Sequence, residues 1–299
     1  MALLLLAHAA MPGGIEAATV DHGLRAEAAD EAAFAASICA ALGVPHATLK
    51  VTLAPGNLQA EARVARYAAL ADWATNRGLA AIATAHHADD QAETLLLRLN
   101  RASGVAGLAG VRATGQTGPN GAVVLRPLLG WRREELAAVV AAAGIKAVQD
   151  PSNIDEKFDR ARIRKAIAEA SWLDVPALAA SAVHLADADA ALDWAAAREW
   201  AAQVERTAMG IIYRPHAPRA IALRVLTRIV TELDGEVPRG STIARLFDAL
   251  VARQPMSIGN LVARALPEGW NFMKAPARRK PSPSKPILLH PPQQLRNDQ

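Results

Sequence analysis

Two histidines and three carboxylates gather in one short segment of the 299-residue chain, Thr84-Ala-His-His-Ala-Asp-Asp-Gln-Ala-Glu-Thr94. Carboxylates held near each other suit the capture of a cation such as an ammonium group, or its deprotonation. The segment begins at Thr84, the last residue of the apolar run 79–84, which we expect to be a strand. Ligands of open α/β sheets bind where strands pass into helices, so this spacing predicts a site at the strand's carboxyl end.

Simpler interpretations of this segment exist. Asp90 and Glu93 stand three residues apart at an expected helix start, which is the spacing of a capping box. A cap needs one acceptor, however, and leaves Asp89 and His86 unexplained. A metal site of histidine and aspartate is a further alternative, but the spacing matches no closed zinc pattern, and we expect no bound metal.

A second pair of polar residues, Asp21 and His22, follows the apolar run 15–20. It would therefore lie at the carboxyl end of a neighbouring strand.

Farther along, five cations fall within nine residues, namely Lys157, Arg160, Arg162, Arg164 and Lys165. Such a cluster could contact phosphate or RNA. The alternative is a solvated helix face that Asp155, Glu156 and Asp159 neutralise.

Composition narrows the class of protein. The single cysteine, Cys39, excludes an internal disulfide and a thiolate metal cluster, and it favours a cytoplasmic protein. The formal charge of +4 lies in the tail. Six cations and one carboxylate from Lys274 onward sum to +5, so the rest of the chain carries −1.

The opening apolar run has no preceding Lys or Arg and is short for a signal peptide. No later run reaches the roughly 18 uninterrupted apolar residues of a membrane span, so we expect no membrane partner.

Strands and helices alternate in the first half of the chain. We expect strands at 15–20, 46–51, 79–84, 123–126 and 145–148, and helices at 1–10, 28–42, 58–77, 90–101 and 132–143. This alternation predicts an α/β fold with a doubly wound parallel sheet. Helical patterns follow at 160–172, 177–206 and 219–233, and two short strands lie within 242–272. We therefore expect an α/β domain over 1–170, a second, mainly helical domain over 171–273, and a disordered basic tail over 274–299.

Several motifs in this order and spacing resemble the bacterial tRNA(Ile)-lysidine synthetase family of PP-loop ATP pyrophosphatases. They are Asp21-His-Gly-Leu-Arg25, Glu61-Ala-Arg-Val-Ala-Arg-Tyr67, His86-His-Ala-Asp-Asp-Gln-Ala-Glu-Thr94, Arg101-Ala-Ser-Gly-Val-Ala-Gly-Leu108, Arg126-Pro-Leu128, and Asp150-Pro-Ser-Asn153 through Arg164. The Asp-Asp-x-x-Glu-Thr segment is shared with other PP-loop enzymes, and the stretch that begins at Asp150 narrows the family.

The resemblance implies an adenine nucleotide alpha hydrolase-like sheet and a two-step reaction. ATP, with Mg²⁺, adenylates the wobble cytidine of an isoleucine tRNA with a CAU anticodon, and free L-lysine then displaces AMP to form lysidine. The resemblance gives Asp90 and Glu93 the lysine amine and places His86 beside the adenylate. It assigns the nucleotide to Asp21, His22, Arg66 and Thr84, and substrate or tRNA contacts to Asp89, Arg160, Arg162, Arg164 and Lys165. The oligomeric state is left open.

The chain departs from the family's pattern at its start. The family begins with a strand and a Ser-Gly-Gly-x-Asp-Ser loop that cradles the ATP phosphates, and the 299 residues contain no such loop. We expect a start codon placed too far downstream. The alternative is a truncated, non-catalytic protein that binds tRNA without using ATP.

Overall fold

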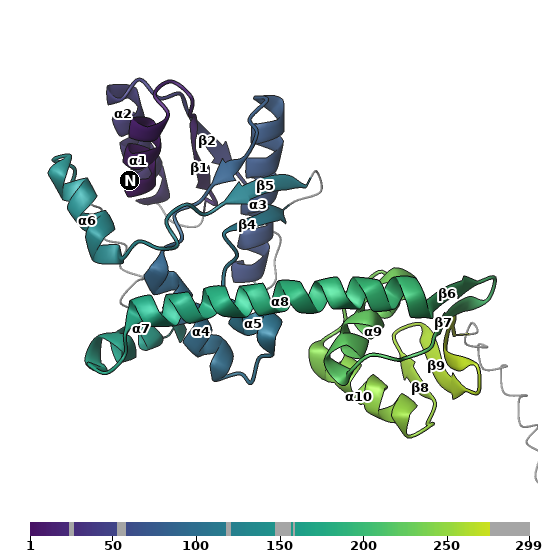
Figure 1. Ribbon diagram of the computed structural model, residues 1–299. Coiled ribbons are helices and arrows are strands. Elements are labelled where there is room, and N and C mark those ends of the chain that lie inside the picture. Colours follow the sequence, from purple (N-terminus) through teal and green to yellow (C-terminus); the bar gives the residue numbers. More distant parts are fainter. Residues whose placement is uncertain (24–26, 53–57, 118–120, 147–156, 158, 276–299) are drawn as a thin grey trace, which may run out of the picture. The chain divides into compact units, whose positions relative to one another are not determined.

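The computed structural model describes residues 1–23, 27–52, 58–117, 121–146, 157 and 159–275 (Figure 1). The chain divides into two compact units, Met1–Ala191 and Leu192–Gln299. The division falls inside the long helix α8 (Val175–Gln203) rather than at the expected boundary of 170 and 171. The Asp150–Asn153 motif and nearly all of the expected tail lie outside the described residues.

The first two strands of the first unit form a parallel pair. Strand β1 (Ala17–Asp21) pairs in parallel with β2 (His46–Lys50), with Ala17 opposite His46 and Asp21 opposite Lys50. Helix α2 (Glu27–Ala41) forms the crossover between them, as parallel pairing requires. Helix α1 (Ala2–Ala10) packs with the later helix α6 (Arg133–Ala142) through a small apolar cluster that includes Leu128 and Leu136.

The remaining strands of this unit form a separate three-stranded sheet. Strand β3 (Ile82–Ala83) pairs in parallel with β5 (Ala122–Leu125), and β4 (Thr114–Thr117) pairs with β5 in antiparallel fashion. Helix α3 (Leu58–Asn76) contacts both sheets, and its Tyr67 and Ala71 pack with Ile82 and Val124. Among the described residues, β1 and β2 do not pair with this sheet, so the single doubly wound sheet expected from the sequence is not continuous.

Two strand predictions in this unit need correction. The expected strand 79–84 shortens to two residues, because three of its six side chains are alanines, which are depleted in strands since they pack little on a pleated surface. The expected strand 145–148 has no strand at Ile145 or Lys146, and its remainder lies outside the described residues. Strand β4 was missed, since Thr-Gly-Gln-Thr shows no apolar alternation.

Two hydrogen bonds join helix α4 (Ala88–Leu99) to the loop that follows the short helix α5 (Val105–Leu108). The buried Gln91 amide donates to the Val111 carbonyl at 2.8 Å and accepts from the Val111 N–H at 2.7 Å. The neighbouring Gly110 has φ of +63°, and a Cβ there would lie 2.4 Å from Gln91 Oε1. The first turns of α4 are therefore fixed by a two-bond clamp that needs a glycine beside it.

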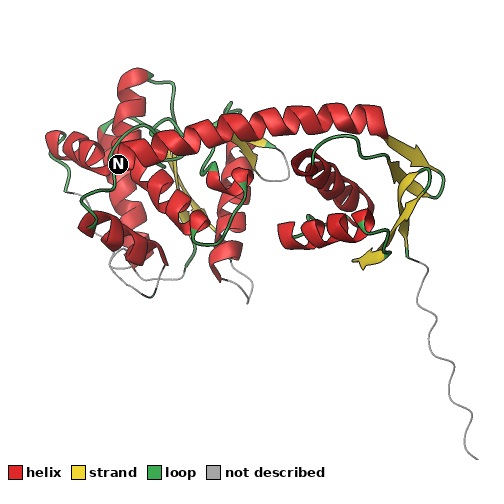
Figure 2. Ribbon diagram, turned by 60° about the horizontal axis from the view of Figure 1, so that its bottom comes forward, coloured by secondary structure: helices red, strands yellow, loops and turns green. Residues whose placement is uncertain are grey.

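The second unit combines its helices with a five-stranded antiparallel sheet, of which the sequence predicted only two short strands (Figure 2). Its strand order is β6 (Val204–Thr207), β7 (Gly210–Tyr213), β10 (Gly269–Lys274), β9 (Leu261–Leu266) and β8 (Met256–Ile258). The helices α9 (Arg219–Asp234) and α10 (Gly240–Val251) pack against it. The first two strands are four residues each, too short to interrupt a helical pattern, so the sequence predicted one helix through Arg206.

One apolar core holds the second unit together. Buried residues of α9 recur at the spacing of one helix face, and they meet Phe272 and Leu261 from the sheet. The Trp270 ring makes edge-to-face contacts with Tyr213 at 5.7 Å and Phe247 at 5.5 Å between centroids. Such pairs add about 0.5–1.5 kcal/mol each to the burial of the rings.

Helix α8 is the one helix among the described residues that is long and apolar enough to cross a membrane by those two criteria alone. Only 22% of its most apolar 18-residue window is buried, and its Asp189 is ion-paired with Arg112. A helix that meets these criteria is weak evidence for a span, since core helices of water-soluble proteins meet them too.

Candidate active site

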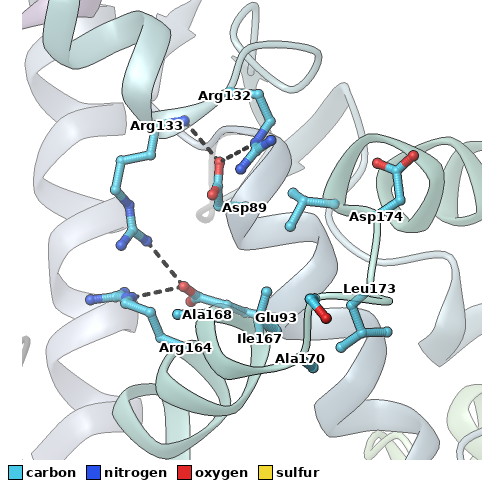
Figure 3. Close-up of a pocket in the computed structure, with 12 residues that line it drawn as sticks. Asp89, Glu93, Arg132, Arg133, Arg164, Ile167, Ala168, Ala170, Leu173 and Asp174 are labelled. Carbon is cyan, nitrogen blue, oxygen red and sulfur yellow. Dashed lines mark hydrogen bonds and ion pairs between the residues drawn. The ribbon is translucent and has the colours of Figure 1, made fainter.

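A pocket of about 500 Å³ lies between α4, the start of α6, α7 (Asp159–Glu169) and the start of α8 (Figure 3). Its charged lining consists of three carboxylates and three guanidinium groups, namely Asp89, Glu93, Asp174, Arg132, Arg133 and Arg164. Ile167, Leu173 and Val175 form an apolar part of the wall. The pocket thus offers both signs of charge beside an apolar surface.

Glu93 is the most deeply buried charged group of this pocket, with 1% of its side chain exposed. Its Oε1 accepts from Arg133 Nη2 at 3.0 Å and from Arg164 Nε at 2.9 Å (Figure 3). Its Oε2 is buried and has no hydrogen-bond partner among the described residues. A buried carboxylate needs compensation, and here two cations share one oxygen while the other acceptor is unused.

Asp89 lies one helical turn before Glu93, on the same side of α4. Its Oδ2 accepts from the backbone N–H of Arg133 at 2.8 Å and from Arg132 Nε at 3.4 Å. Burial alone would raise the pKa of Asp89, but these two donors more than offset it and leave the pKa below its usual value. Asp89 is therefore a carboxylate at neutral pH.

Asp90 has a different environment from Asp89 and Glu93. Its Oδ2 accepts from the backbone N–H of His87 at 3.0 Å, which caps the start of α4, and it does not line the pocket. The capping role considered from the sequence thus belongs to Asp90 with His87 and not to Asp90 with Glu93. In the structure, Asp89 and Glu93 are the carboxylates of α4 that line the pocket, whereas the sequence analysis expected Asp90 and Glu93 to act together.

His86 lies at the end of β3, where its Nδ1 is 3.0 Å from Thr84 Oγ1. Burial lowers the pKa of His86 below its usual value, against the opposing charge of Asp90. Arg126, Arg63 and Arg160 add to the effect of burial. His86 is therefore neutral near pH 7 and can accept or donate one proton at the strand end.

The other strand end brings two predicted residues together with a third. Asp21 Oδ1 accepts from the Gly23 N–H at 2.9 Å and so shapes the turn after β1. His22 Nε2 lies 3.3 Å from Arg66 Nη2 on α3, and His22 Nδ1 is buried without a partner. Burial, followed by the Arg66 charge, lowers the pKa of His22.

The predicted cation cluster divides between two environments on α7. Arg164 turns inward to Glu93, while Arg160, Arg162 and Lys165 are exposed. Asp159 is ion-paired with both Arg162 and Arg101. These ion pairs of Asp159 agree with the alternative of a face that acidic neighbours partly neutralise. Asp155 and Glu156 lie outside the described residues.

Sequence reasoning did not identify Arg132, Arg133 or Asp174 as site residues. The first two begin helix α6, about 40 positions after the carboxylates that they contact. Adjacent arginines before Glu134 and Glu135 resemble an ordinary charged helix start. Only the packing of α6 beside α4 brings them to the site, and no local spacing could have signalled it.

Comparison with known proteins identifies the family. A family model described as a PP-loop domain matches residues 1–171. A tRNA(Ile)-lysidine synthase of Novosphingobium aromaticivorans is 48% identical over 93% of this chain and 86% of its own length. One from Zymomonas mobilis subsp. mobilis is 38% identical over 94% of this chain and 86% of its own. The chain belongs to the tRNA(Ile)-lysidine synthase family.

Membership confirms the resemblance seen in the motifs and shows that the chain is an enzyme of the ligase class with an ATP-binding PP-loop domain. Among solved structures, a U34-tRNA thiolase from Methanococcus maripaludis aligns with a TM-score of 0.49 at 16% identity, covering 61% of this chain and 64% of that one. That likeness is too weak to bear on the site.

Proposed function

We propose that this protein uses ATP to adenylate the wobble cytidine of isoleucine tRNA and then joins free lysine to it. The C2 oxygen of cytidine attacks the α-phosphorus of ATP and pyrophosphate leaves. The ε-nitrogen of lysine then attacks C2, the bond between C2 and that oxygen breaks, and AMP leaves with the oxygen. The proposal rests chiefly on the pocket that holds Asp89 and Glu93 in a chain of this family.

The pocket suits free lysine in charge and in polarity. Lysine carries two ammonium groups and one carboxylate, and the lining has carboxylates and guanidinium groups to match them. Its four methylene groups fit against Ile167, Leu173 and Val175. Within this proposal Asp89 and Glu93 bind the reacting amine, and Asp90 shapes the start of the helix that carries them.

The nucleotide belongs, in this proposal, to the strand ends. His86 and Thr84 after β3 and Asp21, His22 and Arg66 near β1 would border the adenine nucleotide, since ligands of such sheets bind at these ends. Among the described residues no cluster of three or more His, Cys, Asp or Glu side chains could hold a metal ion. In this proposal the phosphates of ATP hold most of the coordination sites of Mg²⁺.

The tRNA contacts we propose are on α7. Arg160, Arg162 and Lys165 are exposed on the helix whose Arg164 reaches Glu93, so a phosphate backbone bound there would lie next to the pocket. The first unit would catalyse the reaction and the second would add tRNA contacts. Free lysine and tRNA meet in the cytoplasm, where we place the protein.

The test measures incorporation of radiolabelled lysine into isoleucine tRNA, together with the release of AMP and pyrophosphate. It uses the 299-residue chain and the same chain preceded by a strand and a Ser-Gly-Gly-x-Asp-Ser loop. Lysine incorporation that depends on ATP in either protein supports the proposal. If both bind tRNA but neither binds ATP by calorimetry, the non-catalytic alternative is correct.

A further inference from the structure

We propose that Arg133 and Arg164 lower the pKa of the bound lysine ε-amine and thereby supply the neutral nucleophile. This inference rests on the proposed function, because it concerns the lysine bound in the same pocket. It gives the two arginines a chemical role beyond neutralising Glu93. The argument depends on which oxygen of Glu93 is already used and on the charges that surround the other.

The unused acceptor defines where the amine binds. Arg133 and Arg164 both donate to Glu93 Oε1, whereas Oε2 is buried and has no partner in the part of the chain that the structure describes. An amine N–H directed at Oε2 would satisfy that atom without displacing either guanidinium group. Lysine would therefore bind beside two cations that remain in place.

The charges at this end of the pocket favour the neutral amine. Two guanidinium groups, those of Arg133 and Arg164, flank the one carboxylate of Glu93. At Asp89, the Arg132 charge and the Arg133 backbone N–H compensate the second carboxylate. Asp174, at the start of α8, is the remaining charged group among the described residues that line the pocket, and it is exposed. Nearby positive charge and an apolar wall both lower the pKa of an amine, and at this position they oppose the Glu93 carboxylate, which raises it.

The size of this effect matters for the reaction. A free lysine amine has a pKa of about 10.4, so only about one molecule in a thousand is neutral near pH 7.4. Each unit by which the site lowers that pKa raises the neutral fraction about tenfold. The proton lost from the ammonium group goes to solvent or through Asp89, and the freed lone pair forms the bond from nitrogen to C2 as AMP leaves.

The experiment titrates the bound amine directly. Lysine labelled with ¹³C at Cε is bound to the full chain, alone and with isoleucine tRNA, and the Cε chemical shift is followed with pH by NMR. We expect the bound amine to titrate about one to two pH units below free lysine. Arg133→Gln, which keeps the backbone N–H to Asp89, should return it at least halfway, whereas Arg133→Lys should keep it low.

Controls separate charge from folding. Arg77→Gln removes an exposed cation that pairs with Glu16 outside the pocket, so it should leave the titration unchanged. If Arg133→Gln does not fold, as judged by circular dichroism, Arg164→Gln tests the same charge. Bound lysine that titrates like free lysine in the wild-type protein overturns this inference and leaves the proposed function standing. If no lysine binds with or without tRNA, the lysine site and this inference both fail.

Discussion

The two units of this molecule are built on different principles. The second unit gathers sixteen buried residues into one apolar cluster, whereas the first divides its described core into clusters of five, four and four. The first unit instead buries a carboxylate between two arginines and opens a pocket beside it. The contrast shows that one continuous apolar core holds the second unit, whereas smaller apolar clusters surround the buried charges and the pocket of the first.

The largest expected effect lies in the second unit. Phe272→Ala removes a ring with 0% exposure from the single core and should lower the free energy of unfolding of this unit by about 3–5 kcal/mol. Hydrogen exchange should show faster exchange in α9, α10 and β9. The matched change Ile82→Ala in the first unit should accelerate exchange around α3 and β5. If Phe272→Ala accelerates exchange in α4 equally, the two units unfold together and the comparison fails.

The second expected effect concerns activity rather than stability. Glu93→Gln removes the charge at the pocket centre and should reduce lysine transfer by about 1.5–3 kcal/mol of binding free energy, which is about tenfold to 150-fold. Adenylation should stay nearly unchanged, because the residues that we propose to bind the nucleotide lie at the strand ends. The measurement is the rate of lysine incorporation against the rate of pyrophosphate release, each at several lysine concentrations.

Two variants sharpen this result. Asp90→Asn alters a helix cap outside the pocket, so it should affect lysine transfer less than Glu93→Gln does. Glu16→Gln is a surface control, since Glu16 pairs with Arg77 away from the pocket. If Asp90→Asn lost lysine transfer as fully as Glu93→Gln, the result would support binding of the lysine amine by Asp90, as the sequence analysis expected.

A smaller effect is expected for tRNA binding. Arg162→Ala combined with Lys165→Ala should weaken binding and reduce the slope of log affinity against log salt by about one to two units. Filter binding at several salt concentrations measures that slope. Removal of residues 281–299 should change it less. The opposite ranking would place the main phosphate contacts in the tail and leave α7 as a solvated face.

The smallest effect concerns acid stability of the first unit. The pKa of Asp89 is lower in the folded chain than its usual 3.8, so its contribution to stability is present above pH 3.8 and is lost as the pH falls through the folded value. Asp89→Asn should therefore flatten the acid side of the stability curve of this unit, as measured by thermal unfolding from pH 3 to pH 6. An unchanged curve would mean that the Arg133 N–H bonds asparagine equally well.

The sequence predicted those parts of the fold that local patterns determine. Helices α2, α3, α4 and α9 appear within a few residues of the predicted positions, because their apolar spacing and closing glycines are local signals. In the five-stranded sheet, the predicted short strands fall near β9 and β10, but β6 and β7 were missed, since short strands such as Val204–Thr207 form only when a partner strand lies beside them. Tertiary pairing, which a single sequence does not display, decided those segments.

The site shows the same division. Asp89, Glu93 and Arg164 could be proposed from their residue types and spacing, and the structure brings all three into one pocket. Their partners Arg132 and Arg133 could not be proposed in this way, because α6 comes close to Asp89 and Glu93 only when elements distant in sequence pack together. The roles of these residues in lysine and tRNA binding stay predictions, which the variants above address.

The clamp between Gln91 and Val111 constrains how this family can vary. Glutamine alone among the side chains of this length offers both a donor and an acceptor to one peptide unit, and Gly110 leaves no room for a Cβ beside it. A mutation at either position alone should be selected against, because it tilts the helix turn that carries Asp89 and Glu93. Positions 91 and 110 should therefore change together during evolution or not at all, so that two residues without any catalytic atom limit which sequences can retain the pocket.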